Sequence, residues 1–132
     1  MLNNIAIHER GHQAAFAFYN VPARIEGNLC IPEPGHNLQL NEHLAVLVAG
    51  AVNESIHFPG NDRLHTGLGG DARLLCNKLG VSETKEINYA LAVALIVLSI
   101  NTRLAIPDEH AALLRIAVRQ AKDILEKKRE MQ

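Results

Sequence analysis

The sequence is poor in the features that mark several large classes of protein. It has only two cysteines, Cys30 and Cys76, which lie far apart and form no CxxC pair, so neither a disulfide framework nor a cysteine zinc site is indicated. We expect both thiols to be reduced and buried. The 13 lysines and arginines balance 14 aspartates and glutamates, and no basic stripe precedes Lys127, Lys128 and Arg129, which argues against a nucleic-acid partner.

Long apolar runs are also missing. The longest, Tyr89 to Ile100, is too short to span a bilayer, and the N-terminus has neither the basic region nor the apolar stretch of a signal peptide. We therefore expect no membrane span and a cytoplasmic location. A chain of 132 residues suffices for a single domain, residues 1–132, which buries about two-thirds of its unfolded surface in one core.

The sequence does contain an HExxH motif, formed by His8, Glu9, Arg10, Gly11 and His12. On an α-helix, residues four apart lie about 40° apart around the axis and about 6 Å apart along it, so both imidazoles leave the same face. Two such nitrogens can share one metal ion, and the glutamate beside them can act as a general base. The same three residues can also occur by chance on an amphipathic helix, so a third ligand is the decisive feature.

Apolar spacing and helix-end signals predict a mainly α-helical fold of about five helices with a small extended element. The helices are expected from Asn3 or Asn4 to Asn20, from Asn41 to His57, from Asp71 to Gly80, from Ser82 or Thr84 to Leu104, and from Pro107 onward, with an extended stretch from Arg24 to Ile31. The fourth helix is apolar around most of its circumference, which predicts that it is the central buried helix. The extended stretch can serve as an edge strand that binds a substrate, or simply as a strand that covers the core.

Two residues of the second predicted helix indicate close packing against a neighbouring element. Gly50 lowers helix propensity and is best explained by the close approach of another backbone. Glu54 lies one turn further along, so it can face the same neighbour as Gly50, although an exposed carboxylate is an equally good interpretation.

The class of metal site depends on the third ligand. Ala15 and Phe18 stand where the extended HExxHxxGxxH pattern needs glycine and histidine, so a metzincin is excluded. A class with a glutamate ligand would use Glu54, and a class with an aspartate ligand would use Asp71, at the start of the third helix and just after the loop from Pro59 to Gly70. A helix N-terminus keeps a carboxylate ionised, which suits a ligand and an ordinary helix cap equally well.

Three segments, in this order, resemble the zinc peptidase domain of FtsH-type AAA proteases. HERGH (8–12) is similar to that family's HEAGH, LVAGAVNESIHF (47–58) to its LxGGRAAEExxFG helix, and TGLGGDARLL (66–75) to its TGASNDLxxAT segment. The closing RQAKDILEKKRE (119–130) also looks like the family's late helix, so the resemblance covers nearly the whole chain.

The resemblance implies that His8, His12 and Asp71 bind Zn²⁺, that Glu9 is the catalytic base, and that Glu54 supports a ligating histidine without ligating the metal. Departures from the family accompany this likeness. Arg10, Ala51 and Ser55 replace a small residue, an arginine and a second glutamate, and the region between Gly35 and Asn41 is much shorter. The chain contains no ATPase module, so we expect it not to unfold or thread folded proteins by itself.

The expected function is zinc-dependent hydrolysis of small peptides or unfolded protein segments. A separate ATPase or protein partner and self-assembly into a homo-oligomer both fit the resemblance. The main alternative is a catalytically silent zinc-binding module that regulates a larger protease. A purely structural zinc site would need a fourth protein ligand, for which Cys30, His57 and His65 are candidates. His65 can also assist catalysis, although a solvated loop histidine is the simpler interpretation.

Overall fold

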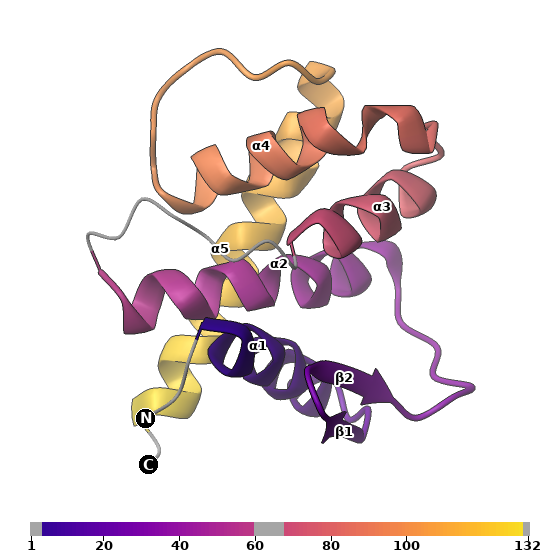
Figure 1. Ribbon diagram of the computed structural model, residues 1–132, viewed down its shortest axis with the longest axis vertical. Coiled ribbons are helices and arrows are strands. Elements are labelled where there is room, and N and C mark those ends of the chain that lie inside the picture. The colour runs from indigo at the N-terminus through magenta and orange to yellow at the C-terminus, as the bar shows by residue number, and fades with distance from the viewer. Residues whose placement is uncertain (1–3, 60–67, 131–132) are drawn as a thin grey trace.

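The structure confirms the mainly helical fold with a small extended element. The computed structural model describes residues 4–59 and 68–130. In this part of the chain the elements follow one another as α1 (Asn4–Phe18), β1 (Ala23–Glu26), β2 (Leu29–Pro32), α2 (Leu40–His57), α3 (Leu68–Lys78), the short 3₁₀ helix η1 (Glu83–Lys85), α4 (Glu86–Val97) and α5 (Asp108–Glu130) (Figure 1).

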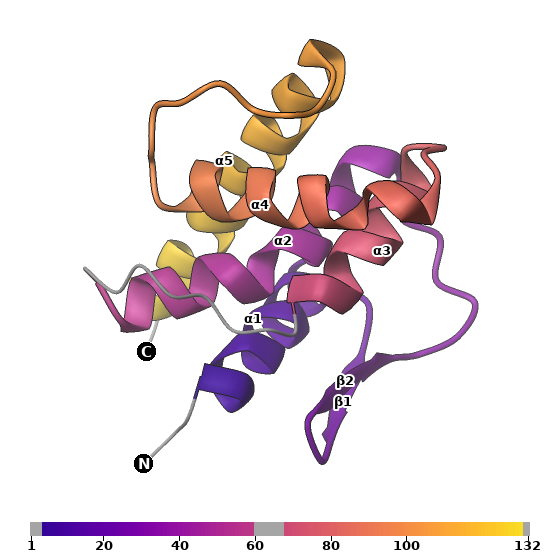
Figure 2. The same ribbon diagram turned by 45° about the horizontal axis from the view of Figure 1, so that its top comes forward.

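Helix α2 forms the centre of the core. All eleven of its residues from Leu44 to Glu54 are buried, and it contacts α1, α3, α4 and α5. Figures 1 and 2 both show α2 between α1 on one side and α3 and α4 on the other, with α5 crossing it. A helix covered on every side has no solvated face, which is why this segment is almost free of charged residues. The position of α2 brings the glutamate at its end, Glu54, into the interior.

The prediction that the fourth helix is the central one is wrong. Ile87 and Leu91 of α4 are 77% and 55% exposed, whereas Tyr89 and Val93 of the same helix are buried. Helix α4 therefore covers the core from one side only. The apolar composition of α4 predicts extensive burial. Which helix lies at the centre of the core depends, however, on packing between segments that are distant in sequence, and composition does not record this packing.

The extended stretch from Arg24 to Ile31 is a β-hairpin. Strands β1 and β2 pair antiparallel, with Arg24 opposite Ile31 and Glu26 opposite Leu29. The two turn residues are Gly27, with φ +59°, and Asn28. A glycine with positive φ at the first central position is typical of the two-residue turns that match strand twist. The Gly-Asn pair is thus the local signal that splits the expected single strand into two.

Three helices end in the same way, with a residue of positive φ just beyond the last turn. Asn20 (φ 63°), Gly80 (φ 70°) and Ser99 (φ 59°) hold this position after α1, α3 and α4. In each case the next amide donates to the carbonyl five residues back, as in a Schellman motif. The ends at Asn20 and Gly80 were expected, but the fourth helix stops at Val97, not near Leu104. Serine seldom adopts a positive φ, so the sequence around Ser99 gives no signal that the helix ends there.

Two helix starts also differ from expectation. Helix α2 begins at Leu40, after Gln39, whose N–H donates to Glu42 Oε1 at 2.9 Å. Asn41 is therefore inside the helix and is not its cap. Helix α3 begins at Leu68, one turn before Asp71, so that Asp71 lies within the first turn. No described helix has both the length and the apolar character needed to cross a membrane.

Candidate metal centre

His8 and His12 leave α1 on the side that packs against α2. Their side chains are buried, with relative exposures of 0% and 6%, and their ring centroids are 4.8 Å apart. Opposite them, α2 presents Gly50, where a methyl group would lie 2.5 Å from His8 Nε2 and 2.7 Å from His12 Nε2. The glycine therefore makes room for the two imidazoles. The expectation that another backbone approaches Gly50 is wrong in detail, because side chains make the approach.

Asp71 reaches the two histidines from the first turn of α3. Its Oδ2 lies 2.7 Å from His8 Nε2 and 3.1 Å from His12 Nε2. The ligand atoms of the three residues lie within 4.8 Å of one another, and in the described part of the chain they are the only such group that can hold a metal ion. Of the two candidates for third ligand, the structure thus brings Asp71, and not Glu54, to the side of the imidazoles that carries Nε2.

The other nitrogen of each imidazole is held by an acceptor on α2. His8 Nδ1 lies 2.5 Å from Glu54 Oε1, and His12 Nδ1 donates to the carbonyl oxygen of Val46 at 2.8 Å. A carbonyl can only accept, so His12 must carry its proton on Nδ1, and in the neutral ring the lone pair is on Nε2. Glu54 Oε1 is the acceptor at His8 Nδ1, so a neutral His8 also has its lone pair on Nε2. Acceptors behind the histidines are typical of metal sites, where they fix ring orientation.

Glu54 was expected either to face this neighbourhood or to be exposed, and the structure decides between them. Its relative exposure is 1%, and its partner is the imidazole of His8. A buried carboxylate without a cation or donor would be costly. Glu54 is thus part of the site. It contacts the imidazole of His8 on the side opposite Nε2 and is not itself one of the three clustered groups.

The charges of the site shift the pKa of two of its members. Burial alone would lower the pKa of His8, but the hydrogen bonds and negative charges of Asp71 and Glu54 outweigh it and raise the pKa to about 9. Burial would raise the pKa of Asp71, but the neighbouring His12 and His8 outweigh it and lower that pKa below its usual range. Asp71 is therefore ionised at neutral pH, and its negative charge favours a cation at the cluster.

The donor set fits a metal ion better than it fits the protein alone. With both Nδ1 atoms donating to α2, the two Nε2 atoms and a carboxylate oxygen converge on one point. Because the pKa of His8 is raised to about 9, the metal-free chain holds a proton on His8 Nε2 at neutral pH, and that proton serves only one of the two contacts with Asp71. One divalent cation would satisfy all three acceptors at once. Two imidazoles and one carboxylate form a ligand set that suits zinc and other first-row divalent metals.

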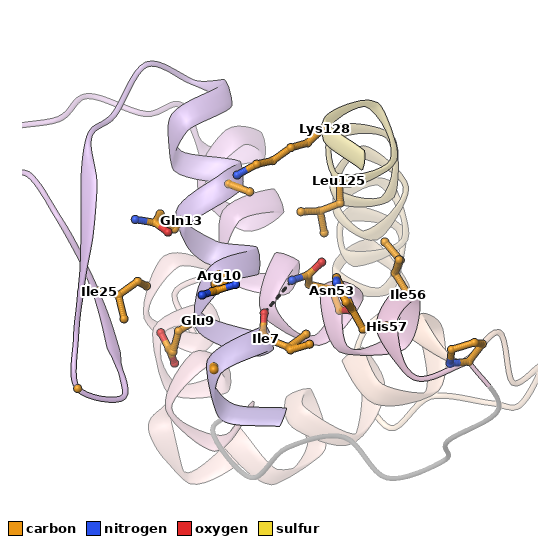
Figure 3. A pocket seen from close by; sticks show the side chains of 14 residues that line it. Ile7, Glu9, Arg10, Gln13, Ile25, Asn53, Ile56, His57, Leu125 and Lys128 are labelled. Carbon is orange, nitrogen blue, oxygen red and sulfur yellow. Dashed lines mark hydrogen bonds between the residues drawn. The ribbon is translucent and has the colours of Figure 1, made fainter. Parts of the chain in front are cut away.

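Glu9 projects from α1 to one side of this cluster. It lies about 100° around the helix from His8, and its Oε2 accepts a hydrogen bond from the backbone N–H of Cys30 at 2.9 Å. The contact links the predicted base to strand β2. Figure 3 shows the side chain between α1 and the hairpin. Glu9 therefore lies beside the three clustered groups without joining them. This is the arrangement expected of a general base next to metal ligands.

The two described candidates for a fourth ligand, Cys30 and His57, do not join the cluster. His57 turns its Nδ1 to the carbonyl of Asn53 at 3.0 Å. Cys30 is only half-buried, contrary to expectation, while Cys76 is fully buried. Burial and the nearby Glu9 raise the pKa of the Cys30 thiol to about 11, which keeps it protonated. His65 lies outside the described residues. Among those described, three ligands converge, the number that leaves a coordination position open.

The sequence interpretation missed two residues that hold α1 against α2. A methyl group at Gly11 would lie 2.5 Å from the carbonyl oxygen of Ala49, so the two backbones touch here. Asn53 is buried, and its side-chain amide donates to the carbonyl of Ile7 at 2.8 Å. Glycine inside a helix signals such an approach, and Gly11 was available as this signal within the motif itself.

Comparison with protein-family models, curated proteins and solved structures found no match to this chain. The interpretation of its function therefore depends on the geometry of the site and on the motifs that form it.

Proposed function

We propose that this protein is a zinc-dependent metallopeptidase, with His8, His12 and Asp71 as the zinc ligands and Glu9 as the general base. The observation that carries the proposal is the convergence of Asp71 Oδ2 on both Nε2 atoms, across 63 and 59 residues of sequence. An HExxH pair on one helix is a local pattern, but a carboxylate delivered to it by another helix is not. Zinc in such a site would polarise a water molecule and a substrate carbonyl.

The protein's own groups have separate roles in this proposal. Glu9 accepts a proton from the attacking water and returns it to the leaving amine. The N–H of Cys30 donates to Oε2 of Glu9, and no described group donates to the other oxygen, which can take this proton. Glu54 and the carbonyl of Val46 keep the two imidazoles in the tautomer that offers Nε2 to a metal.

Peptides and unfolded protein segments are the substrates that we propose. The hairpin lies beside α1, in contact with Glu9, and an extended chain can be added to the edge of a strand by backbone hydrogen bonds. Folded proteins would require a separate ATPase or another partner to unfold them, and we retain that partner and a homo-oligomer as proposals from the family resemblance.

One observation favours a second candidate function, a zinc-binding module without catalysis. Glu9 makes its described hydrogen bond to the hairpin and not to the metal ligands. If that contact held the carboxylate permanently away from the zinc water, the chain would bind zinc and regulate a larger protease without hydrolysing peptides.

Cleavage of a fluorescence-quenched unfolded protein by the zinc-loaded chain distinguishes the two functions. We expect cleavage that is abolished by Glu9→Gln and by chelation, and restored to the chelated sample by zinc. The matched control is Glu109→Gln, which changes an exposed carboxylate at the start of α5 and should leave cleavage unchanged. A chain that binds one zinc ion per molecule but cleaves nothing contradicts the peptidase proposal and favours the silent module.

A further inference from the structure

A groove crosses the face of α1 that points away from the metal ligands. Its volume is about 830 Å³, within the range of ligand pockets, roughly 300–1,000 Å³. Arg10 projects into it, about 200° around the helix from His8, so the groove and the metal cluster lie on different sides of α1. The hairpin borders it on one side, and the end of α2 together with α5 borders it on the other (Figure 3).

Most polar side chains in the groove already have partners within the chain. Glu9 accepts from the N–H of Cys30, Gln13 donates to the carbonyl of Ala23 at 2.9 Å, and Asn53 donates to the carbonyl of Ile7. His57 uses its Nδ1 on the carbonyl of Asn53. These groups shape the walls of the groove, and the remaining polar side chains of the described lining are two cations.

Those two cations are Arg10 and Lys128. Both are exposed, and neither forms an ion pair with any residue that the structure describes. Figure 3 shows Lys128 extending from α5 toward α1, the helix that carries Arg10 on another of its turns. They come from elements that are far apart in sequence, yet they share one cavity. Aliphatic side chains line the space around them, namely Ile7, Ile25, Ile56 and Leu125.

We propose that this groove binds an acidic peptide segment, with Arg10 and Lys128 as the groups that bind its carboxylates. The aliphatic lining suits apolar side chains between the acidic ones, and charge complementarity selects the sign of the ligand. Among the described residues that line the groove there is no Phe, Tyr or Trp, the side chains on which single-stranded bases most often stack, and this disfavours a nucleic acid. The site goes beyond the proposed peptidase function, because binding here needs neither a metal ion nor hydrolysis.

Fluorescence anisotropy of labelled peptides tests the groove without any reaction. The probes are a peptide in which glutamates alternate with leucines, its Gln/Leu counterpart and its Lys/Leu counterpart, titrated with the full chain at low salt. We expect the acidic peptide to bind most tightly. Exposed ion pairs contribute up to about 1 kcal/mol each, so Arg10→Ala and Lys128→Ala should each weaken binding about two- to fivefold.

The matched control is Arg119→Ala, which removes the same charge from α5 about two and a half turns before Lys128, on the opposite face of the helix. It should bind the acidic peptide as the unmodified chain does. The double charge reversal Arg10→Glu with Lys128→Glu should prefer the Lys/Leu peptide. Because both positions are exposed, the circular dichroism melting curves should stay unchanged.

Three results would overturn the proposal. The first is equal affinity for the acidic and neutral peptides. The second is a loss in Arg119→Ala as large as that in Arg10→Ala, since it would mean that net charge alone attracts the peptide. The third is tighter binding of single-stranded DNA that Arg10→Ala abolishes, since it would identify a nucleic-acid site. Failure of peptide cleavage would not bear on any of these measurements.

Discussion

Substitution of Gly50 by alanine is a sharp test of the metal centre. The added methyl group would lie 2.5 Å from His8 Nε2, 2.6 Å from His8 Cδ2 and 2.7 Å from His12 Nε2, whereas ordinary contacts of a Cβ are 3.4–4 Å. One or both imidazoles must therefore move by roughly 1 Å, while metal–ligand distances tolerate only about ±0.2 Å. The perturbation acts on the ligand atoms and leaves their chemistry unchanged.

Two quantities follow from this displacement. Misoriented histidine ligands typically lose 10–100-fold in metal affinity, and a direct clash with both ligands should reach about 100-fold, or roughly 2.8 kcal/mol. The stability of the metal-free chain should change less. Overpacking costs about 1–3 kcal/mol, and the replacement of a helical glycine returns about 1 kcal/mol, so the net loss is roughly 0–2 kcal/mol.

Zinc affinity, measured by competition with a chromogenic chelator, and urea unfolding of the metal-free chain check the two values. Gly70→Ala is the control, because a methyl group there meets no atom within 4 Å although the position is adjacent to Asp71. Unchanged zinc affinity in Gly50→Ala would refute the placement of the two Nε2 atoms against α2. Equal losses in both variants would show that the effect does not come from the clash.

Three further predictions concern the charged members of the site. Glu54→Gln should weaken zinc binding 10–100-fold by weakening the orientation of His8, and unchanged affinity would contradict the role given to Glu54. Asp71→Ala removes the proposed third ligand and should weaken zinc binding more than Glu54→Gln does, with an equal or smaller effect counting against Asp71 as a ligand. In the metal-free chain, the pKa of His8 is raised from 6.5 to about 9, so its protonation stabilises the fold fully below pH 6.5, and this stabilisation is lost as the pH rises through 9. The free energy of unfolding in urea should fall by roughly 3 kcal/mol across this range, and a fall of the same size in His8→Gln would assign it to another group.

Much of the candidate site could be predicted because it depends on short-range spacing. The helix that carries His8 and His12 follows from local apolar periodicity, and helical geometry then fixes that both imidazoles share a face. Gly50 and Glu54 could be singled out for the same reason, since they lie one turn apart on α2. The choice between Glu54 and Asp71 as third ligand could not be made from spacing. It depends on the side from which α3 approaches α1, and the family resemblance alone favoured Asp71.

The errors in the fold have physical causes of the same kind. The apolar segment of α4 and the small-residue segment of α2 are both depleted of charge, and only long-range packing decides that α2 is enclosed while Ile87 remains 77% exposed. The early end of α4 at Val97 is followed by Ser99 in a left-handed backbone conformation, which serine seldom adopts and which its residue type therefore does not predict.

By itself, the sequence determined the helical class, the position of most helices and the pair of histidines with its adjacent glutamate, because these depend on the backbone geometry of neighbouring residues. The tertiary structure decided the rest. It brought Asp71 to the Nε2 atoms, placed Glu54 and the Val46 carbonyl behind the imidazoles, and placed Arg10 and Lys128 along the same groove. Each of these arrangements brings together residues that are far apart in the chain. They form only when helices pack, a process governed by the fit of whole surfaces and not by any local pattern.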